Sequence, residues 1–190
     1  MALILITDKT FDKVDFTVNR PEQAEYDNCA FSNCNFSGVD LADLKFTECV
    51  FTGCNLSLAK LGKTAMREIS FRDCKMLGLR FDLCNQFGFS INVENCNLNH
   101  SSFFKTSNRK KVFKNSQLQE VDFIECDLSS TIFDNCDLSR ATFENTVLEK
   151  TDFRTSYNYR IDPEKNRMKK GMYALAGLPG LLEKYDIQID

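Results

Sequence analysis

The chain has 190 residues, of which 43% are hydrophobic and 27% are charged, and its formal net charge is −3. This composition is typical of a soluble globular protein with a real core and argues against a disordered chain. A net charge this small does not by itself indicate a partner. The first residues lack the basic flank and cleavage site of a signal peptide, and no apolar stretch is long enough to cross a bilayer. We therefore expect a cytoplasmic protein without membrane contact.

An apolar residue recurs every fifth position through most of the chain. The first series runs from Phe16 to Phe81, broken only by Pro21, and the second runs from Leu98 to Phe153. Helices repeat every 3.6 residues and strands every 2.0, so a period of five indicates a backbone that turns a corner in every unit. The two series differ in phase by two residues, and we place the break near residues 84–96.

The position two residues before each central apolar residue is the second regular feature. It holds mostly small or β-branched residues, and all nine cysteines of the chain occupy it. The remaining positions are largely Asp, Asn, Ser, Thr, Lys and Glu. This is binary patterning with a period of five, which predicts two inward positions and an exposed wall in each unit.

Central residues of one type also recur at intervals of twenty. If four units make one turn, such residues stack directly above one another and form ladders in the core. The predicted ladders of central residues are Phe31, Phe51 and Phe71; Phe103, Phe123 and Phe143; and Phe113, Phe133 and Phe153. The inward position two residues earlier adds a fourth ladder, Cys34, Cys54 and Cys74.

From Phe11 to Phe153 this pattern resembles the pentapeptide-repeat family. The resemblance implies an all-β fold, a right-handed quadrilateral β-helix. We expect residues 1–155 to form this solenoid and residues 156–190 to form a C-terminal helical segment, because the repeat ends and Asp162 precedes Pro163 as a helix-start signal.

An apolar stripe in the C-terminal segment is the candidate dimer interface. A solenoid end needs a cover, so the stripe either caps the last coil alone or also contacts a second copy in a homodimer. Its residues are Leu178, Leu181, Leu182, Tyr185 and Ile187.

The cysteines do not have the pattern of a chemical site. A zinc site needs closely spaced thiolates completed by further Cys or His ligands, whereas this chain has no C-x-x-C pair and only His100. Stacked cysteines would have Cα atoms about 4.8 Å apart, which is within the range for a disulfide. Parallel inward side chains keep the Cβ atoms equally far apart, however, and a reducing cytoplasm also favours free thiols. Buried thiols also make poor nucleophiles. We predict no catalytic site, no metal and no cofactor.

A basic run occupies the middle of the chain, from Lys105 to Lys114. Asn108 at a central site and Lys111 at the inward site before Phe113 suggest that one unit here is distorted and bulges outward. We therefore favour the interpretation that this run is a solvated loop over the hypothesis that it binds nucleic acid directly.

A rigid rod without a deep pocket is suited to binding another macromolecule. The resemblance extends to the quinolone-resistance (Qnr) and mycobacterial fluoroquinolone-resistance proteins, and it implies a homodimer that imitates DNA when it binds a protein partner, DNA gyrase or topoisomerase IV. The modest charge and the lack of long projecting loops favour the alternative, a scaffold for another protein partner. The candidate acidic surface consists of Asp122, Glu125, Asp127, Asp134, Asp137 and Glu144.

Overall fold

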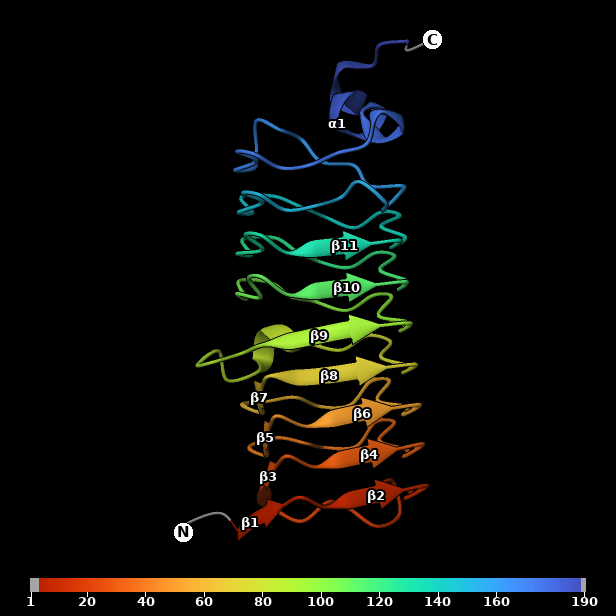
Figure 1. Cartoon of the computed structure of the whole chain (residues 1–190), viewed down its shortest axis with the longest axis vertical. Coiled ribbons are helices and arrows are strands. Elements are labelled where there is room, and N and C mark those ends of the chain that lie inside the picture. Colours follow the sequence, from red (N-terminus) through yellow and green to blue (C-terminus); the bar gives the residue numbers. More distant parts are fainter. Residues whose placement is uncertain (1–3, 189–190) are drawn as a thin grey trace.

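The computed structural model describes residues 4–188, which form a straight rod of stacked coils with the two ends of the chain at opposite ends of the rod (Figure 1). Strands in successive coils pair in parallel, typically with residues twenty apart, as in Phe31 with Phe51. Side chains alternate between the core and the outer wall. The predicted fold class, a right-handed quadrilateral β-helix with a short C-terminal helix, is confirmed.

Two walls of the rod contain regular strands. Wall A is the sheet β1-β3-β5-β7, and beyond residue 85 it continues as the bridge column Ser107–Asp127–Val147–Arg167. The strands of wall A are β1 (Ile4–Thr7), β3 (Ala24–Asp27), β5 (Lys45–Thr47) and β7 (Ala65–Arg67). Wall B is a seven-stranded sheet. Its strands are β2 (Thr10–Asp12), β4 (Ala30–Ser32), β6 (Val50–Thr52), β8 (Ile69–Arg72), β9 (Ile91–Glu94), β10 (Val112–Lys114) and β11 (Ile132–Asp134).

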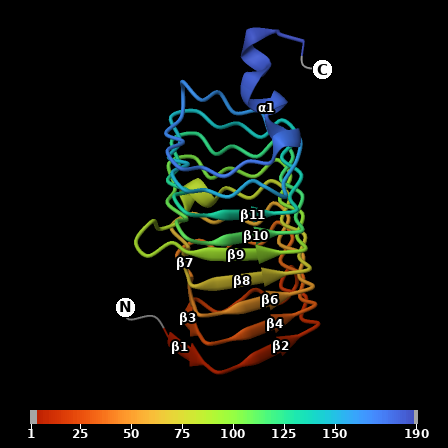
Figure 2. The same cartoon turned by 45° about the horizontal axis from the view of Figure 1, so that its top comes forward.

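The other two walls are held by single bridges between coils. Wall C is the column that runs from Asp15 through Asn35 and Asn55 to Tyr157. Wall D contains the bridge of Asp40 with Lys60 and the column Arg80–Ser102–Asp122–Thr142, and its coil also carries the 3-10 turn η1 (Phe81–Leu83). Figure 2 shows the four-sided outline when the rod is tilted forward.

Aromatic ladders fill the core. The rings of Phe31 and Phe51 are stacked with centroids 4.7 Å apart, and those of Phe133 and Phe153 are 4.9 Å apart. These distances match the spacing of about 4.8 Å between paired strands, so each ring lies on the ring of the neighbouring coil. The ladder residues named from the sequence are all buried, except that Phe143 retains a slight exposure of 6%.

The corners of the coil repeatedly place non-glycine residues in the left-handed region. Asn33, Asn95 and Asn135 have φ of 54°, 54° and 51°. Asparagine tolerates this region better than most residues because its short polar side chain forms local hydrogen bonds. Lysine and glutamate also occur there, as in Glu48 and Lys150. Corner side chains point into solvent, so the corners supply much of the charge that a partner can contact.

The regular twenty-residue step is interrupted once, between β8 and β9. Phe71 pairs with Val93, a step of 22 residues, because residues 86–90 form a loop that projects from the rod beside β9 (Figure 1). Gln86 stands in the central place of the repeat but is exposed, whereas Phe89 in the loop is buried. The two extra residues thus bring a phenyl ring into the core in place of a polar amide.

The basic run after this loop does not bulge, which corrects the expectation from the sequence. Ser107 bridges Asp127, and the backbone N–H of Lys110 donates to the carbonyl of Ser129, as in a regular coil. The expectation was wrong because Asn108 is an inward residue whose carboxamide has a partner. Its side chain bonds to both backbone groups of Ile91, at 3.0 and 3.1 Å.

Inter-coil pairing continues past residue 155 into the C-terminal segment. Val147 bridges Arg167 and Asp152 bridges Met172. The chain then forms three short turns of helix, η2 (Leu175–Gly177), α1 (Pro179–Leu182) and η3 (Glu183–Tyr185). Among residues 4–188, none of the helices combines the length and the hydropathy that a membrane span requires.

Candidate interaction surfaces

The six carboxylates of the candidate acidic surface lie around the rod and do not converge on one face. Asp127 belongs to wall A, Asp137 to wall C and Asp122 to wall D, and Asp134 is the last residue of β11 on wall B. Glu125 is at the corner between walls D and A. Consecutive units occupy consecutive walls, so carboxylates that are close in sequence point in different directions.

Stacking between coils also neutralises part of this set. Lys105 Nζ lies 3.5 Å from Glu125 Oε2, twenty residues along the chain. Lys165 Nζ likewise lies 2.9 Å from Glu144 Oε1. Cations from the coils on either side therefore offset part of the negative charge of residues 121–150.

The remaining carboxylates of the set are fixed by hydrogen bonds. Asp137 accepts hydrogen bonds from Ser139, Gln119 and Asn158. Burial opposes ionisation of Asp137, but these donors outweigh it and lower the pKa of its carboxyl. Asp122 accepts from the backbone N–H of Ile124. These side chains hold the wall in shape as well as carrying charge.

The least compensated negative charge lies at the other end of the rod. Residues 4–50 carry nine carboxylates and four basic residues, and Glu25 with Lys45 is the single ion pair found among those carboxylates in the described chain. On wall A, Asp8, Asp27 and Glu48 follow one another in successive coils at or beside the corner. We call these three residues the acidic strip.

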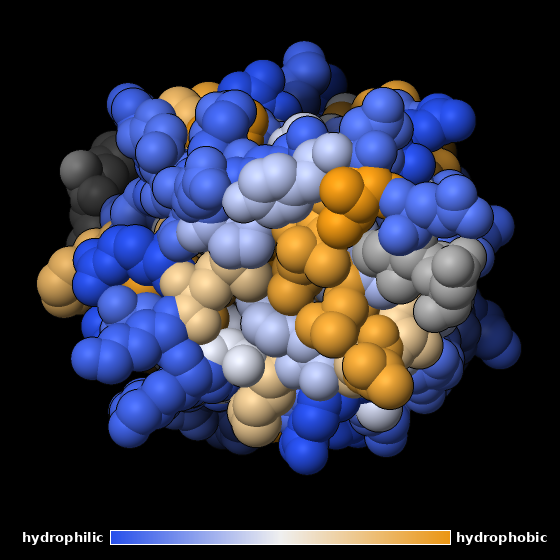
Figure 3. All heavy atoms as spheres, turned by 90° about the horizontal axis from the view of Figure 1, so that it is seen from above, coloured by the Kyte–Doolittle hydropathy of each residue, from blue (hydrophilic) through white to orange (hydrophobic). Residues whose placement is uncertain are grey.

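Apolar side chains gather at the C-terminal end of the rod (Figure 3). Leu181 packs against the core and covers the last coil. Leu178, Tyr185 and Ile187 of the candidate dimer interface are exposed, at 38%, 52% and 56%, whereas Leu182 is half-buried. The predicted stripe is thus divided: one residue closes the coil, and three leave apolar area open at the surface.

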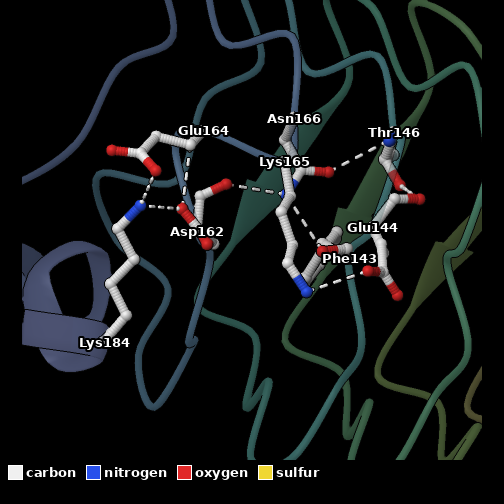
Figure 4. A network of polar contacts seen from close by, with 8 residues as sticks. All are labelled: Phe143, Glu144, Thr146, Asp162, Glu164, Lys165, Asn166 and Lys184. Atoms are coloured by element: carbon white, nitrogen blue, oxygen red, sulfur yellow. Dashed lines mark hydrogen bonds and ion pairs between the residues drawn. The ribbon is translucent and has the colours of Figure 1, made fainter.

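Polar contacts attach the terminal helices to the coil below (Figure 4). Lys184 Nζ lies 2.7 Å from both Asp162 Oδ1 and Glu164 Oε2, and its ammonium lowers the pKa of both carboxyls. Asn166 donates to the carbonyl of Phe143 at 2.9 Å. The position of the exposed apolar residues is therefore fixed relative to the rod.

The cysteine thiols lie in the core and are free. Burial raises the pKa of Cys49 to about 12, and it does the same for Cys126 and Cys136. A thiol with such a pKa stays protonated at neutral pH and is a poor ligand or nucleophile. Within residues 4–188 there is also no cluster of three His, Cys, Asp or Glu side chains placed to hold a metal.

Comparisons with known proteins agree with the repeat. A family model described as pentapeptide repeat region matches residues 24–91, and one described as pentapeptide repeats (8 copies) matches residues 113–155. A search of curated proteins returned no match.

Several solved structures match this chain at low sequence identity. A trypsin-treated form of QnrB1, a plasmid-mediated fluoroquinolone resistance protein, is 21% identical over all of both chains, with a TM-score of 0.49. HetL of Nostoc sp. strain PCC 7120, involved in heterocyst differentiation regulation, is 16% identical over 90% of this chain and 88% of its own, with a TM-score of 0.39. The segments matched by the two family models make up more than half of the 190 residues, and this chain belongs to the pentapeptide-repeat family.

Proposed function

We propose that this protein is a non-catalytic rod that binds a protein partner through its outer walls. In the specific form of the proposal, the partner is a type II topoisomerase, DNA gyrase, and the acidic half of the rod occupies a surface that otherwise holds DNA. The observation that carries the proposal is the uncompensated charge of residues 4–50, where eight of nine carboxylates have no ion pair in the described chain.

The geometry of the acidic strip supports this choice of partner. Duplex DNA presents about one negative charge per 1.7 Å of its axis on a stiff, regular lattice. Asp8, Asp27 and Glu48 present carboxylates at intervals of about 4.8 Å on a wall whose backbone is fixed by inter-coil hydrogen bonds. A basic groove that binds DNA would therefore contact a rigid row of anions on this wall, with fewer charges per unit length than duplex DNA has.

Self-association at the C-terminal end belongs to the same proposal. Leu178, Tyr185 and Ile187 leave apolar area exposed there, and a second copy placed end to end would bury it. Such a dimer would present two acidic halves pointing away from each other, one at each end of a longer rod.

Titration into a gyrase supercoiling reaction, with and without a fluoroquinolone, tests the proposal. We expect inhibition of supercoiling at micromolar protein, or protection from the drug. Absence of both effects would remove the topoisomerase from the proposal and favour the alternative, a scaffold for another protein.

Two charge-reversed variants locate the surface. Asp27→Lys combined with Glu48→Lys should abolish the effect on gyrase. The matched control is Glu125→Lys combined with Glu144→Lys, which makes the same change in net charge within the acidic set named from the sequence. Because those two carboxylates are already paired with lysines, the control should retain the effect. Equal loss in both variants would mean that net charge, not the acidic strip, is recognised.

A further inference from the structure

Wall A changes sign along its length. Beyond the projecting loop, its outward positions carry six cations, from residues up to 61 positions apart in sequence that the bridges Ser107–Asp127–Val147–Arg167 place on one wall. We call them the basic strip: Arg109, Lys110, Lys150, Arg167, Lys169 and Lys170. All six are exposed.

Four of these cations have no ion pair among residues 4–188. Arg109 is paired with Asp127 at 3.5 Å, and Arg167 with Glu149 at 2.8 Å. The four without an ion pair in the described chain are Lys110, Lys150, Lys169 and Lys170. This part of wall A therefore has four uncompensated positive charges, although the whole chain has a net charge of −3.

The backbone arranges three of the lysines in a line. Lys110, Lys150 and Lys170 are corner residues with φ of 58°, 58° and 60°, so they stand on the same edge of the rod. At about 4.8 Å per coil, the first two are about 10 Å apart and the last two about 5 Å apart. The coil between Lys110 and Lys150 carries Ser129 and Ser130 at the corresponding outward positions, which leave room for a phosphate. The Ser129 hydroxyl already donates to Asp127, so Ser130 is the residue that offers a hydroxyl donor.

We propose that the basic strip binds the phosphate backbone of a nucleic acid. A line of flexible lysines on a rigid edge fits a chain of phosphates, and contacts to phosphate need no base-specific geometry. This surface is separate from the acidic strip, and its function does not depend on the topoisomerase proposal.

Two other occupants fit the wall less well. An anionic membrane lying along wall A would also meet Asp27 and Glu48 of the acidic strip, whereas a short nucleic acid covers the basic half alone. A second copy packed antiparallel would match acidic against basic halves, but the loop of residues 86–90, with Phe87 79% exposed, projects midway along the wall (Figure 1) and would collide with its counterpart.

The expected salt dependence of binding follows from the four cations that have no ion pair. Neutralising about four phosphates gives a slope of about −3.6 for log K against log salt concentration on a duplex, and about −2.8 on a single strand. Affinity for a duplex should therefore fall by about a hundredfold between 50 and 200 mM salt. Binding should be largely independent of base sequence.

Fluorescence anisotropy with a labelled 20-base-pair duplex, and with one of its strands, tests the proposal. The full-length chain should bind at 50 mM salt and show the expected salt slope. Lys150→Glu combined with Lys170→Glu should weaken binding at least tenfold. The matched control is Lys60→Glu combined with Lys75→Glu, on walls D and C, and it should weaken binding less than threefold. Glutamate already occupies the same corner at Glu48, and Lys60 and Lys75 are exposed, so both variants should fold, which circular dichroism checks.

Three results would overturn the proposal: no binding at 100 µM protein and 50 mM salt, equal losses in the two variants, or tighter binding to anionic vesicles or polyglutamate than to DNA. Failure here leaves the supercoiling experiment unaffected, because the variants that decide that experiment alter carboxylates and none of the lysines or arginines of the basic strip.

Discussion

Asn108 forms two hydrogen bonds with the backbone of Ile91 through its side chain, accepting from the N–H at 3.0 Å and donating to the carbonyl at 3.1 Å. Ile91 begins β9, directly after the two-residue insertion. In other coils the N–H at this inward position bonds to a side chain of the next coil, as the N–H of Cys96 does to Ser116 Oγ, and at Ile91 the buried carboxamide of Asn108 takes that place. A polar residue at a central position of the repeat thus pairs backbone groups of the preceding coil.

Replacing this carboxamide by a larger apolar group should destabilise the protein. Asn108→Leu leaves the N–H and carbonyl of Ile91 unpaired in the core, at a cost of about 1–3 kcal/mol. The midpoint of guanidinium unfolding measures the change. A midpoint equal to or above that of the unchanged chain would contradict the role assigned to Asn108.

Removing the insertion should destabilise the protein unless Gln86 is also replaced. Deletion of Phe87 and Gly88 restores the twenty-residue step but turns Gln86 toward the core, where an unpaired amide is costly. We therefore expect the deletion alone to be destabilising and the deletion with Gln86→Leu to recover stability. Unfolding midpoints of the two variants measure the change, and a deletion variant as stable as the unchanged chain would contradict the role assigned to the insertion.

The buried thiols should make the protein less stable in alkaline solution. Burial raises the pKa of Cys49, Cys126 and Cys136 to about 12. Above pH 9 the unfolded chain releases these protons while the folded chain retains them. Stability is therefore complete below pH 9 and falls as pH rises toward 12, by up to about 1.4 kcal/mol per pH unit for each thiol. Unfolding midpoints at pH 7, 9 and 10 measure the slope, which should be shallower in Cys126→Val with Cys136→Val. An identical slope in that variant would contradict the assignment.

Substitutions should show that some C-terminal apolar residues cap the last coil and that others contact a second copy of the chain. Leu181 packs against the core, so Leu181→Ala should lower stability by about 1–2 kcal/mol. Leu178→Glu alters an exposed side chain and should leave the unfolding midpoint nearly unchanged while preventing self-association. Sedimentation equilibrium at micromolar concentration should give the mass of two chains for the unchanged protein and of one chain for Leu178→Glu. A single-chain mass for the unchanged protein would refute the dimer.

The sequence was sufficient to predict the β-helix because its signal is local and repeated. Each unit places an apolar residue at the centre and a small residue two positions earlier, and the twenty-residue recurrence of phenylalanines predicts the ring ladders, such as Phe31 on Phe51. The exceptions were harder to interpret. Asn108 and Lys111 seemed to mark a distorted unit, but their partners are Ile91 and Glu68, 17 and 43 residues away.

The charged surfaces could not be predicted from the linear sequence for a geometric reason. Neighbouring units face different walls, so a run of carboxylates such as Asp122 to Glu144 is distributed around the rod. Residues twenty positions apart lie next to each other instead. Their charges either cancel, as those of Lys105 and Glu125 do, or add up, as those of Lys150 and Lys170 do on one corner. Summing charge by column, with the step of 22 included, would have found both strips of wall A.

The central claim is that the acidic half of the rod occupies a DNA-binding surface of a protein partner. The most direct measurement is displacement of a fluorescent duplex from gyrase by the chain carrying Lys150→Glu and Lys170→Glu, which weakens the chain's own binding to the duplex. We predict that this chain displaces the duplex at micromolar concentration and that adding Asp27→Lys and Glu48→Lys abolishes the displacement. Simultaneous binding of both ligands to gyrase, or displacement unchanged by the acidic-strip substitutions, would contradict the account.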